Sequence, residues 1–246
     1  RVRAAMRLHP FGVLLLFAGI SGMGARTEVA RANEQASRAD RAPEHRNDRV
    51  LEQLAQISRN LRESKYNHVT RVNEREGRYE FDCSGFVTWV LRRVAPGAYA
   101  AVMSRSKTGR PVARDYYWEF ARAPTARSPR GVLRIERVAE AQAGDIVAWL
   151  KPALVQSPNT GHVGFLLERP RPVPQLPGGY LVRIADASSY QHQDDDRSDS
   201  GRTGFGSGTI LLVANLETGA AQAYGWFGLQ SYYVLETPIA IGRVTR

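Results

Sequence analysis

Three residues with complementary chemistry stand at the edges of predicted secondary-structure elements, in the order Cys, His, Asp. Cys83 is the only cysteine in 246 residues, and it follows a polar turn where a helical apolar pattern begins. His162 opens a predicted strand, and Asp186 ends the next one. A thiol nucleophile needs a base to take its proton, and an imidazole base needs an acceptor on its other ring nitrogen. The three residues together predict a site for nucleophilic hydrolysis.

The residues after Cys83 predict a helix with Cys83 in its first turn. Phe86, Val87, Val90 and Leu91 form one apolar stripe at helical spacing, continued by Val94. Unpaired N–H groups and the positive end of the helix dipole favour an anion there, so we expect a thiolate at this position with a lowered pKa. The alternative is a buried structural cysteine, because cysteine is among the most buried residue types. Asp82, next to it, is interpreted as the helix N-cap and not as a catalytic acid.

Two glycine-led segments, residues 144–149 and 161–167, predict buried strands, and residues 181–189 predict the strand that carries Asp186. The position of His162 at the start of its strand would place the imidazole at the end of the sheet, beside the beginning of the Cys83 helix. His192, six residues after Asp186, is the rival for the third catalytic position. It lies in a polar segment with no strand pattern to fix its direction, so Asp186 is favoured.

At these residues the chain resembles the NlpC/P60 family of papain-like cysteine peptidases, bacterial hydrolases of cell-wall peptides. The resemblance spans about residues 50 to 190 and is carried by Tyr66, seventeen residues before the cysteine, and by three motifs: Asp82-Cys83-Ser84-Gly85-Phe86, Gly144-Asp145-Ile146-Val147 and Gly161-His162-Val163-Gly164. It implies that Cys83 is the nucleophile and His162 the general base. Tyr66 and Ser84 are assigned by it to the oxyanion and substrate side. The family's third residue is commonly His, Asn or Gln, so Asp186 is a departure, although a carboxylate holds an imidazolium more strongly than an amide does.

The resemblance and the patterns predict an α+β fold, a papain-like NlpC/P60 fold with N-terminal helices packed on an antiparallel sheet of five or more strands. An amphipathic helix is expected from Asp48, because Val50, Leu51, Leu54 and Ile57 recur at helical spacing. Residues 208–214 and 221–226 flank a hairpin turn at Asn215, and residues 232–241 are expected to form the last strand.

Three segments are expected along the chain. Residues 1–32 have the basic stub and short apolar run of a signal peptide, and residues 33–47 read as a disordered leader. Residues 48–246 are expected to form a single NlpC/P60-like catalytic domain, with insertions near 95–131 and 170–179. Aromatic residues at 116–120 in the first insertion either line a substrate cleft or fix the insertion to the core, and the second interpretation is favoured. The expected signal peptide predicts a secreted or periplasmic location.

Composition bears on partners more than on fold. The net charge is +10, and all but three of the 34 basic residues are arginine. A cationic exported protein is drawn to anionic surfaces, but the basic residues are spread along the chain and match no nucleic-acid motif. We expect a monomer with no nucleic-acid partner and no stable membrane insertion after signal removal. The acidic run at 194–199 is interpreted as a solvated loop, because its register does not fit a calcium loop.

These observations predict an exported cysteine hydrolase that cleaves an amide bond in peptidoglycan stem peptides through Cys83, His162 and Asp186, without metal or organic cofactor. Two alternatives stay open. One is a noncatalytic module of the same fold that binds the cell envelope or peptidoglycan. The other is a thiol hydrolase or acyltransferase acting on a different small amide or ester.

Overall fold

The computed structural model describes residues 44–245. The expected signal peptide and residues 33–43 of the expected leader lie outside the described residues. The first described helix, α2, spans Glu44–Asn60, so it begins four residues before Asp48. Residues 44–47 therefore belong to the helix and not to a leader. Asn47 is buried and its amide donates to the Ala143 carbonyl at 2.8 Å, which ties the first turn of α2 to the domain.

Helices and strands alternate unevenly along the described residues. The remaining helices are α3 (Cys83–Val94), α4 (Pro96–Met103) and α5 (Ala113–Arg122), with short 3-10 turns at Val138–Glu140 and Gly228–Gln230. The first strands are β1 (Glu63–Tyr66), β2 (Arg71–Asn73) and β3 (Arg78–Phe81). The later strands are β4 (Val132–Ile135), β5 (Ile146–Leu150), β6 (Gly161–Leu166), β7 (Arg171–Pro172), β8 (Gly179–Ser188), β9 (Gly204–Ala214), β10 (Ala221–Gly225), β11 (Leu235–Glu236) and β12 (Ile239–Val244).

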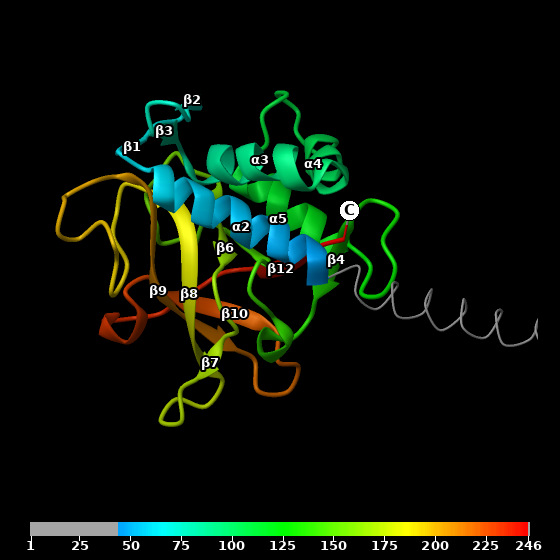
Figure 1. Ribbon diagram of the computed structural model, residues 1–246. Helices are drawn as coiled ribbons and strands as arrows, with labels where there is room; N and C mark the ends of the chain where they lie inside the picture. Colours follow the sequence, from blue (N-terminus) through cyan, green and yellow to red (C-terminus); the bar gives the residue numbers. More distant parts are fainter. Residues whose placement is uncertain (1–43, 246) are drawn as a thin grey trace, which may run out of the picture. The chain divides into compact units, whose positions relative to one another are not determined.

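The fold is α+β and is dominated by one antiparallel sheet of nine strands (Figure 1). The strand order is β11-β10-β9-β8-β6-β5-β12-β4, with β7 paired to β8. The hairpin expected at Asn215 is confirmed, because β9 and β10 pair on either side of it. The expected last strand is divided in two: β11 pairs with β10, whereas β12 pairs with β5 and β4. Pro238 lies between them, and a residue without an N–H suits the point where the chain changes partner.

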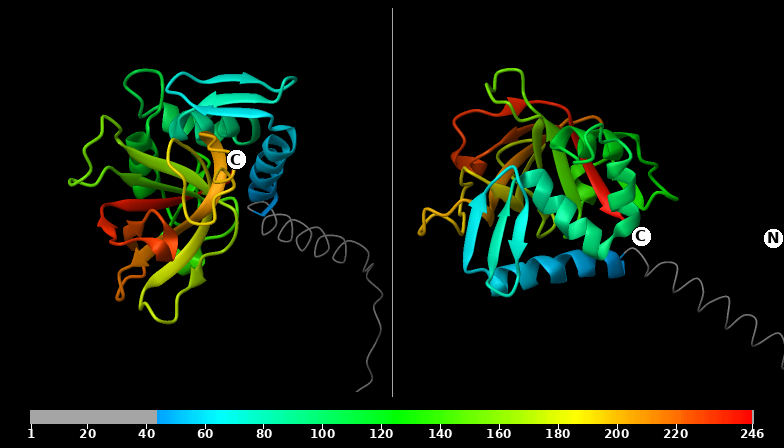
Figure 2. Two further views of the ribbon diagram at one scale, coloured as in Figure 1. Left: turned by 90° about the vertical axis from the view of Figure 1, so that its left-hand side faces the viewer. Right: turned by 90° about the horizontal axis from the view of Figure 1, so that it is seen from above.

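The helices cover one face of this sheet. α3 lies on β6 and β8, α5 lies on β5 and β12, and α2 packs beside α3. The apolar stripe of α3 is confirmed, since Phe86, Val87, Val90 and Leu91 are fully buried there. A small sheet of order β1-β3-β2, which the sequence did not predict, lies near one end of α2 (Figure 2). No helix among the described residues is long and apolar enough to cross a membrane.

Apolar side chains fill the space on both faces of the central strands. On β5, Ile146 and Ala148 belong to the cluster under the helices, whereas Val147 and Trp149 belong to a second cluster on the opposite face. A strand buried on both faces has no polar alternation, which explains its continuous apolar sequence. The second cluster leads toward His162, because Trp149 stacks against its ring with centroids 5.0 Å apart.

The two expected insertions differ in their relation to this core. Residues 95–131 contain α4 and α5, and Tyr116 and Phe120 of α5 are buried in the core under the helices. Those two aromatic residues therefore fix the insertion in place, as favoured, while Trp118 is 38% exposed. The 170–179 loop follows the end of β6, so it lies at the opposite end of this strand from His162. It lies beside the turn between β9 and β10, because a Cβ at Gly178 would lie 2.5 Å from the Ala214 carbonyl oxygen and 3.1 Å from Leu216.

Candidate active site

Cys83 is the first residue of α3, and Asp82 is its N-cap. The Asp82 carboxylate accepts from the Gly85 N–H at 2.7 Å and from the Ser84 hydroxyl at 3.0 Å. Its other oxygen bonds to His68 Nδ1 at 2.9 Å and accepts from Arg110. Asp82 thereby joins the helix start to the β1–β2 connection and to the segment before α5. Its structural assignment from the sequence is confirmed.

The Cys83 thiol is nearly buried, with 7% of the residue exposed. Burial and the neighbouring charge of Asp82 raise the pKa of this thiol, and the backbone N–H groups of Val163 and Ser84 oppose them only in part. The expectation of a lowered pKa at the helix start is therefore wrong in direction. Loss of hydration outweighs the helix dipole at this depth, so the resting sulfur is a neutral thiol.

The Val163 contact also locates the thiol relative to the sheet. Val163 is the residue after His162, so the sulfur lies against the first residues of β6. The thiol and the His162 ring are not hydrogen-bonded to each other in this structure. Within the described residues the Cys83 N–H donates no hydrogen bond. An open N–H beside the thiol is a suitable oxyanion donor.

His162 and Asp186 are brought together by the pairing of β6 with β8. His162 Nε2 lies 2.6 Å from Asp186 Oδ2, and both side chains are buried. Gly164 makes this approach possible, because a Cβ at that position would lie 2.9 Å from the Ala185 carbonyl oxygen. With Nε2 donating to the carboxylate, Nδ1 of His162 carries the lone pair that can accept a proton. The sequence prediction of an imidazole oriented by Asp186 agrees with this geometry.

His192 also contacts this carboxylate, through the same oxygen as His162 does. Its Nε2 lies 2.8 Å from Asp186 Oδ2, and its Nδ1 lies 3.1 Å from the Trp226 carbonyl oxygen. A carbonyl and a carboxylate both accept only, so each ring nitrogen of His192 faces an acceptor. His192 is thus a partner of Asp186 and does not replace it beside His162.

Arg197 completes this buried group, and the sequence analysis missed it. It is 1% exposed and forms two hydrogen bonds with Asp195, at 2.7 Å from Nε and 2.6 Å from Nη2. Its Nη1 donates to the Gly204 carbonyl at 2.8 Å and lies 3.0 Å from Asp186 Oδ1, so the guanidinium charge stands beside this carboxylate oxygen.

The charges around Asp186 fix its protonation state. Burial alone would raise the pKa of this carboxyl, but the charge of His192 and the hydrogen bonds from both histidines hold it well below the usual value. The neighbouring Asp195 also has a lowered pKa, because hydrogen bonds from Arg197 and the His192 backbone outweigh its burial. The expectation that the 194–199 run is a solvated loop is therefore wrong for Asp195, which is buried.

Glycines on β9 are the sequence signal that could have located this group. A Cβ at Gly206 would lie 2.5 Å from the Arg197 side chain, and one at Gly208 would lie 2.7 Å from His192 Cβ. Alternate glycines on one strand mark a face that another segment approaches closely. The Gly204-Phe205-Gly206-Ser207-Gly208 sequence thus indicated that the polar loop before it folds back over β9.

Tyr66 and Ser84 differ in what they offer a substrate. Tyr66 is half-buried at the end of β1, and burial together with the charge of Asp82 raises the pKa of its phenol. It keeps its proton, and Asn159 Nδ2 lies 3.4 Å from its oxygen, so the hydroxyl remains a donor. The Ser84 hydroxyl, in contrast, donates to Asp82, which leaves its side chain a role in the helix start.

Two hollows meet near Cys83 and share Tyr66, Pro158, Asn159 and Gly161. The first has a volume of about 190 Å³ and contains Cys83. The second has a volume of about 620 Å³, contains His162, and is bordered by aromatic residues, namely Trp149, Tyr190, Tyr224, Trp226 and Phe227. An extended ligand that crosses Tyr66 would reach both the thiol and the imidazole.

One group of described residues has the spacing of metal ligands: His162, Asp186 and His192 offer ligand atoms within 4.8 Å of one another. A metal there would have to replace both imidazole hydrogen bonds and would stand close to the Arg197 cation. A buried arginine 3.0 Å from the carboxylate is unfavourable for a divalent ion. The donor set therefore fits hydrogen bonding better than metal binding.

Comparison with known proteins identifies one distant relative. The chain is 28% identical over 216 residues to an uncharacterized protein of Acanthamoeba polyphaga mimivirus, an alignment that covers 78% of this chain and 92% of the relative. No family model and no solved structure matches the chain. The name of the relative states no activity, so the function rests on the geometry of the site.

Proposed function

We propose that the protein is a cysteine hydrolase of the NlpC/P60 type, with a papain-like arrangement of helix and sheet, that cleaves an amide bond in peptides. The observation that carries the proposal is the buried pair of His162 and Asp186, whose side chains lie 2.6 Å apart. The residue after His162, Val163, contacts the Cys83 sulfur through its N–H, so the pair lies beside the thiol. A neutral thiol, an oriented base and an open N–H at a helix start are the parts that acyl transfer requires.

The residues have distinct roles in the proposed reaction. Nδ1 of His162 takes the thiol proton as the sulfur attacks the substrate carbonyl carbon, and a carbon–sulfur bond forms. The resulting oxyanion accepts from the Cys83 N–H and the Tyr66 hydroxyl. Asp186 stabilises the imidazolium, which then protonates the leaving amine as the carbon–nitrogen bond breaks. Water, deprotonated by His162, attacks the thioester and releases the acid product and the thiol.

The thiol and imidazole are not hydrogen-bonded in the absence of substrate, which is common in resting hydrolases. Tyr66 lines both hollows, so a ligand that occupies both passes beside its hydroxyl. The aromatic border beside His162 offers flat apolar surface for an extended peptide. These features support a stem peptide of peptidoglycan as the substrate, and the resemblance in the Cys83 and His162 motifs supports it further.

Digestion of purified peptidoglycan, analysed by mass spectrometry, tests the proposal. The wild-type protein is expected to release peptide fragments, and Cys83→Ala is expected to release none while keeping its circular dichroism and melting temperature. Asp199→Ala is the matched control, because Asp199 is an exposed acid of the 194–199 run, and it should retain full activity.

Other outcomes would select the alternatives. Binding of sacculi in a salt-sensitive manner without any cleavage would favour a noncatalytic envelope-binding module. Cleavage of simple esters or amides by a Cys83-dependent route, with intact muropeptides, would favour a thiol hydrolase of another substrate class.

A further inference from the structure

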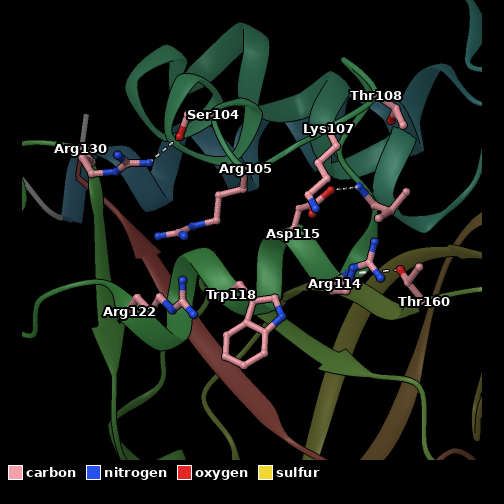
Figure 3. A pocket seen from close by; sticks show the side chains of 11 residues that line it. Ser104, Arg105, Lys107, Thr108, Arg114, Asp115, Trp118, Arg122, Arg130 and Thr160 are labelled. Atoms are coloured by element: carbon pink, nitrogen blue, oxygen red, sulfur yellow. Dashed lines mark hydrogen bonds between the residues drawn. The ribbon is translucent and has the colours of Figure 1, made fainter.

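A third pocket, beside the catalytic hollows, has five cationic side chains among the eleven residues that line it. It has a volume of about 700 Å³ and lies between α5 and the segment that follows α4 (Figure 3). The cations on its walls are Arg105, Lys107, Arg114, Arg122 and Arg130. Trp118 stands among them, and Asp115 is the one carboxylate on the walls. The sequence analysis saw only a long insertion here.

Two of the five cations are held in place by a buried acid. Glu119 is 2% exposed and pairs with Arg105 and with Arg130, whose Nε lies 3.0 Å from Oε1. Arg130 also donates to the Ala101 carbonyl at 3.0 Å and to Ser104 Oγ at 2.7 Å. This wall of the pocket is therefore formed before any ligand arrives, which lowers the ordering cost of binding.

The other three cations have no such partner. Within residues 44–245, Lys107, Arg114 and Arg122 form no ion pair. The Asp115 carboxylate accepts a hydrogen bond from the Val112 N–H at 3.0 Å. Counting Glu119, two carboxylates face five cations, which leaves three positive charges in excess. Like charges on the walls of one hollow repel each other, and a bound anion with several charges relieves that repulsion.

The side-chain types favour a phosphate group over a single carboxylate. Guanidinium groups bind phosphate oxygens through paired hydrogen bonds, and three surplus charges match a diphosphate better than one carboxylate. Trp118 offers a partly exposed ring, with Arg122 4.9 Å from its centroid, for an apolar or ring portion of the same ligand.

The pocket adjoins the hollow that contains Cys83. Val112 and Thr160 line both of them, and Thr160 Oγ1 accepts from the Arg114 N–H at 3.2 Å. We propose that this pocket binds a phosphate or diphosphate group carried by the substrate whose amide bond reaches Cys83. The proposal adds a substrate class to the proposed function and rests on it for the word substrate, whereas the anion site itself stands on its own geometry.

Binding measured without catalysis separates the two claims. Isothermal titration of Cys83→Ala with inorganic pyrophosphate should show one site, with inorganic phosphate weaker and binding reduced by salt. The double variant Arg114→Ala/Arg122→Ala should bind pyrophosphate about 10- to 100-fold more weakly, because two charged donors are lost. The control Arg59→Ala/Arg169→Ala removes two exposed arginines that are not on the pocket walls and should bind as the parent does.

Three results would overturn the anion site: no heat of binding up to about 10 mM pyrophosphate, where only very weak complexes escape detection; equal binding by both double variants; or tighter binding of glutarate than of pyrophosphate. The last would assign the pocket to peptide carboxylates. The ring contact is tested with ADP, which should bind Cys83→Ala more tightly than pyrophosphate does. The added substitution Trp118→Ala should remove this difference in affinity.

A kinetic measurement addresses the word substrate. In the Cys83-containing protein, Arg114→Ala/Arg122→Ala should raise KM for a phosphorylated peptide about tenfold or more and leave KM for its unphosphorylated form unchanged. Equal KM effects on both peptides would contradict a substrate role, even if pyrophosphate binds. Absence of any hydrolysis would contradict the proposed function and leave the titration result standing.

Discussion

Two carboxylates border the candidate site, and each holds a different kind of group in place. Asp82 lies at the start of α3, where it accepts from backbone, serine, histidine and arginine donors. Asp186 lies on β8 within the sheet, where it contacts His162, His192 and Arg197. Asp82 fixes the backbone that presents the thiol, whereas Asp186 fixes the base. Both remain ionised because each has several donors or cations around it.

The two carboxylates differ in their access to water and in their effect on the reaction. The arginine that pairs with Asp82 has a side chain 39% exposed, whereas the one beside Asp186 is 1% exposed. Charge at Asp186 favours the imidazolium that forms in the reaction, while charge at Asp82 opposes the thiolate more strongly than charge at Asp186 does. An acid near a nucleophile is thus helpful or harmful according to which partner it faces.

The largest effect is expected from removing the carboxylate that faces the base. Asp186→Ala should lower turnover by about 10³- to 10⁴-fold, because His162 loses both its orientation and the charge that stabilises its protonated form. Asp186→Asn keeps an acceptor and should lie between that variant and the wild type. Steady-state rates on released peptides measure this, and Asp199→Ala is the control for loss of an acid nearby.

His192 sharpens this first prediction. The sequence favoured Asp186 over His192 as the third catalytic residue, and in the structure Asp186 contacts His162 and His192 through one oxygen, Oδ2. His192→Ala should therefore reduce turnover by less than Asp186→Ala does. A larger loss in His192→Ala than in Asp186→Ala would contradict the assigned order of contacts.

The second effect compares the two arginines. Arg197→Ala leaves Asp186 and Asp195 buried without their cation and should reduce the free energy of unfolding by roughly 3 to 5 kcal/mol. Arg110→Ala removes a pair that is screened by water and should cost about 1 kcal/mol or less. Urea denaturation followed by tryptophan fluorescence measures both. Similar losses in the two variants would show that burial does not separate the two carboxylates.

Much of the arrangement around these residues could be predicted from the sequence, because local patterns determine it. The stripe from Phe86 to Leu91 predicts the helix, and the segments 144–149 and 161–167 predict buried strands, which the structure contains as β5 and β6. The strand positions of His162 and Asp186 follow from those registers. These patterns determine where a strand or helix begins and which face each side chain takes. That was enough to predict that the base and its acid lie close together.

The remainder depends on contacts between distant segments. Strands β1 to β3 are short and their residues are mostly polar, so no periodicity distinguishes them from a loop. Arg197 and His192 lie in a polar loop whose burial appears only when it folds over the glycines of β9. The pKa of the thiol depends on a balance of burial, Asp82 and two N–H groups, which no spacing in the sequence reveals.

The third effect is a loss of stability in acid. The pKa of Asp82 and that of Asp186 are lower in the folded protein than the value of about 3.9 in an unfolded chain. Such groups stabilise the fold fully above about pH 4 to 5, and the contribution is lost as the pH falls through the folded values, at about 1.4 kcal/mol for each pKa unit of difference. The urea midpoint should therefore decline below pH 4. Asp186→Asn should flatten this decline more than Asp82→Asn, and equal slopes in all three proteins would refute the assignment.

The smallest effect concerns the thiol and the carboxylate beside it. Because the charge of Asp82 raises the pKa of Cys83, Asp82→Asn should shift the pH profile of iodoacetamide alkylation to lower pH and speed the reaction several-fold at pH 8. Asparagine is also a good N-cap, so the start of α3 should persist in this variant. Glu80→Gln is the matched control, since it removes a carboxylate two residues away that bonds to Asn67 and Arg71 and not to the helix start. An alkylation rate in Asp82→Asn equal to that of the control would mean that burial alone keeps the thiol neutral, and Asp82 would then act only through the backbone that it holds.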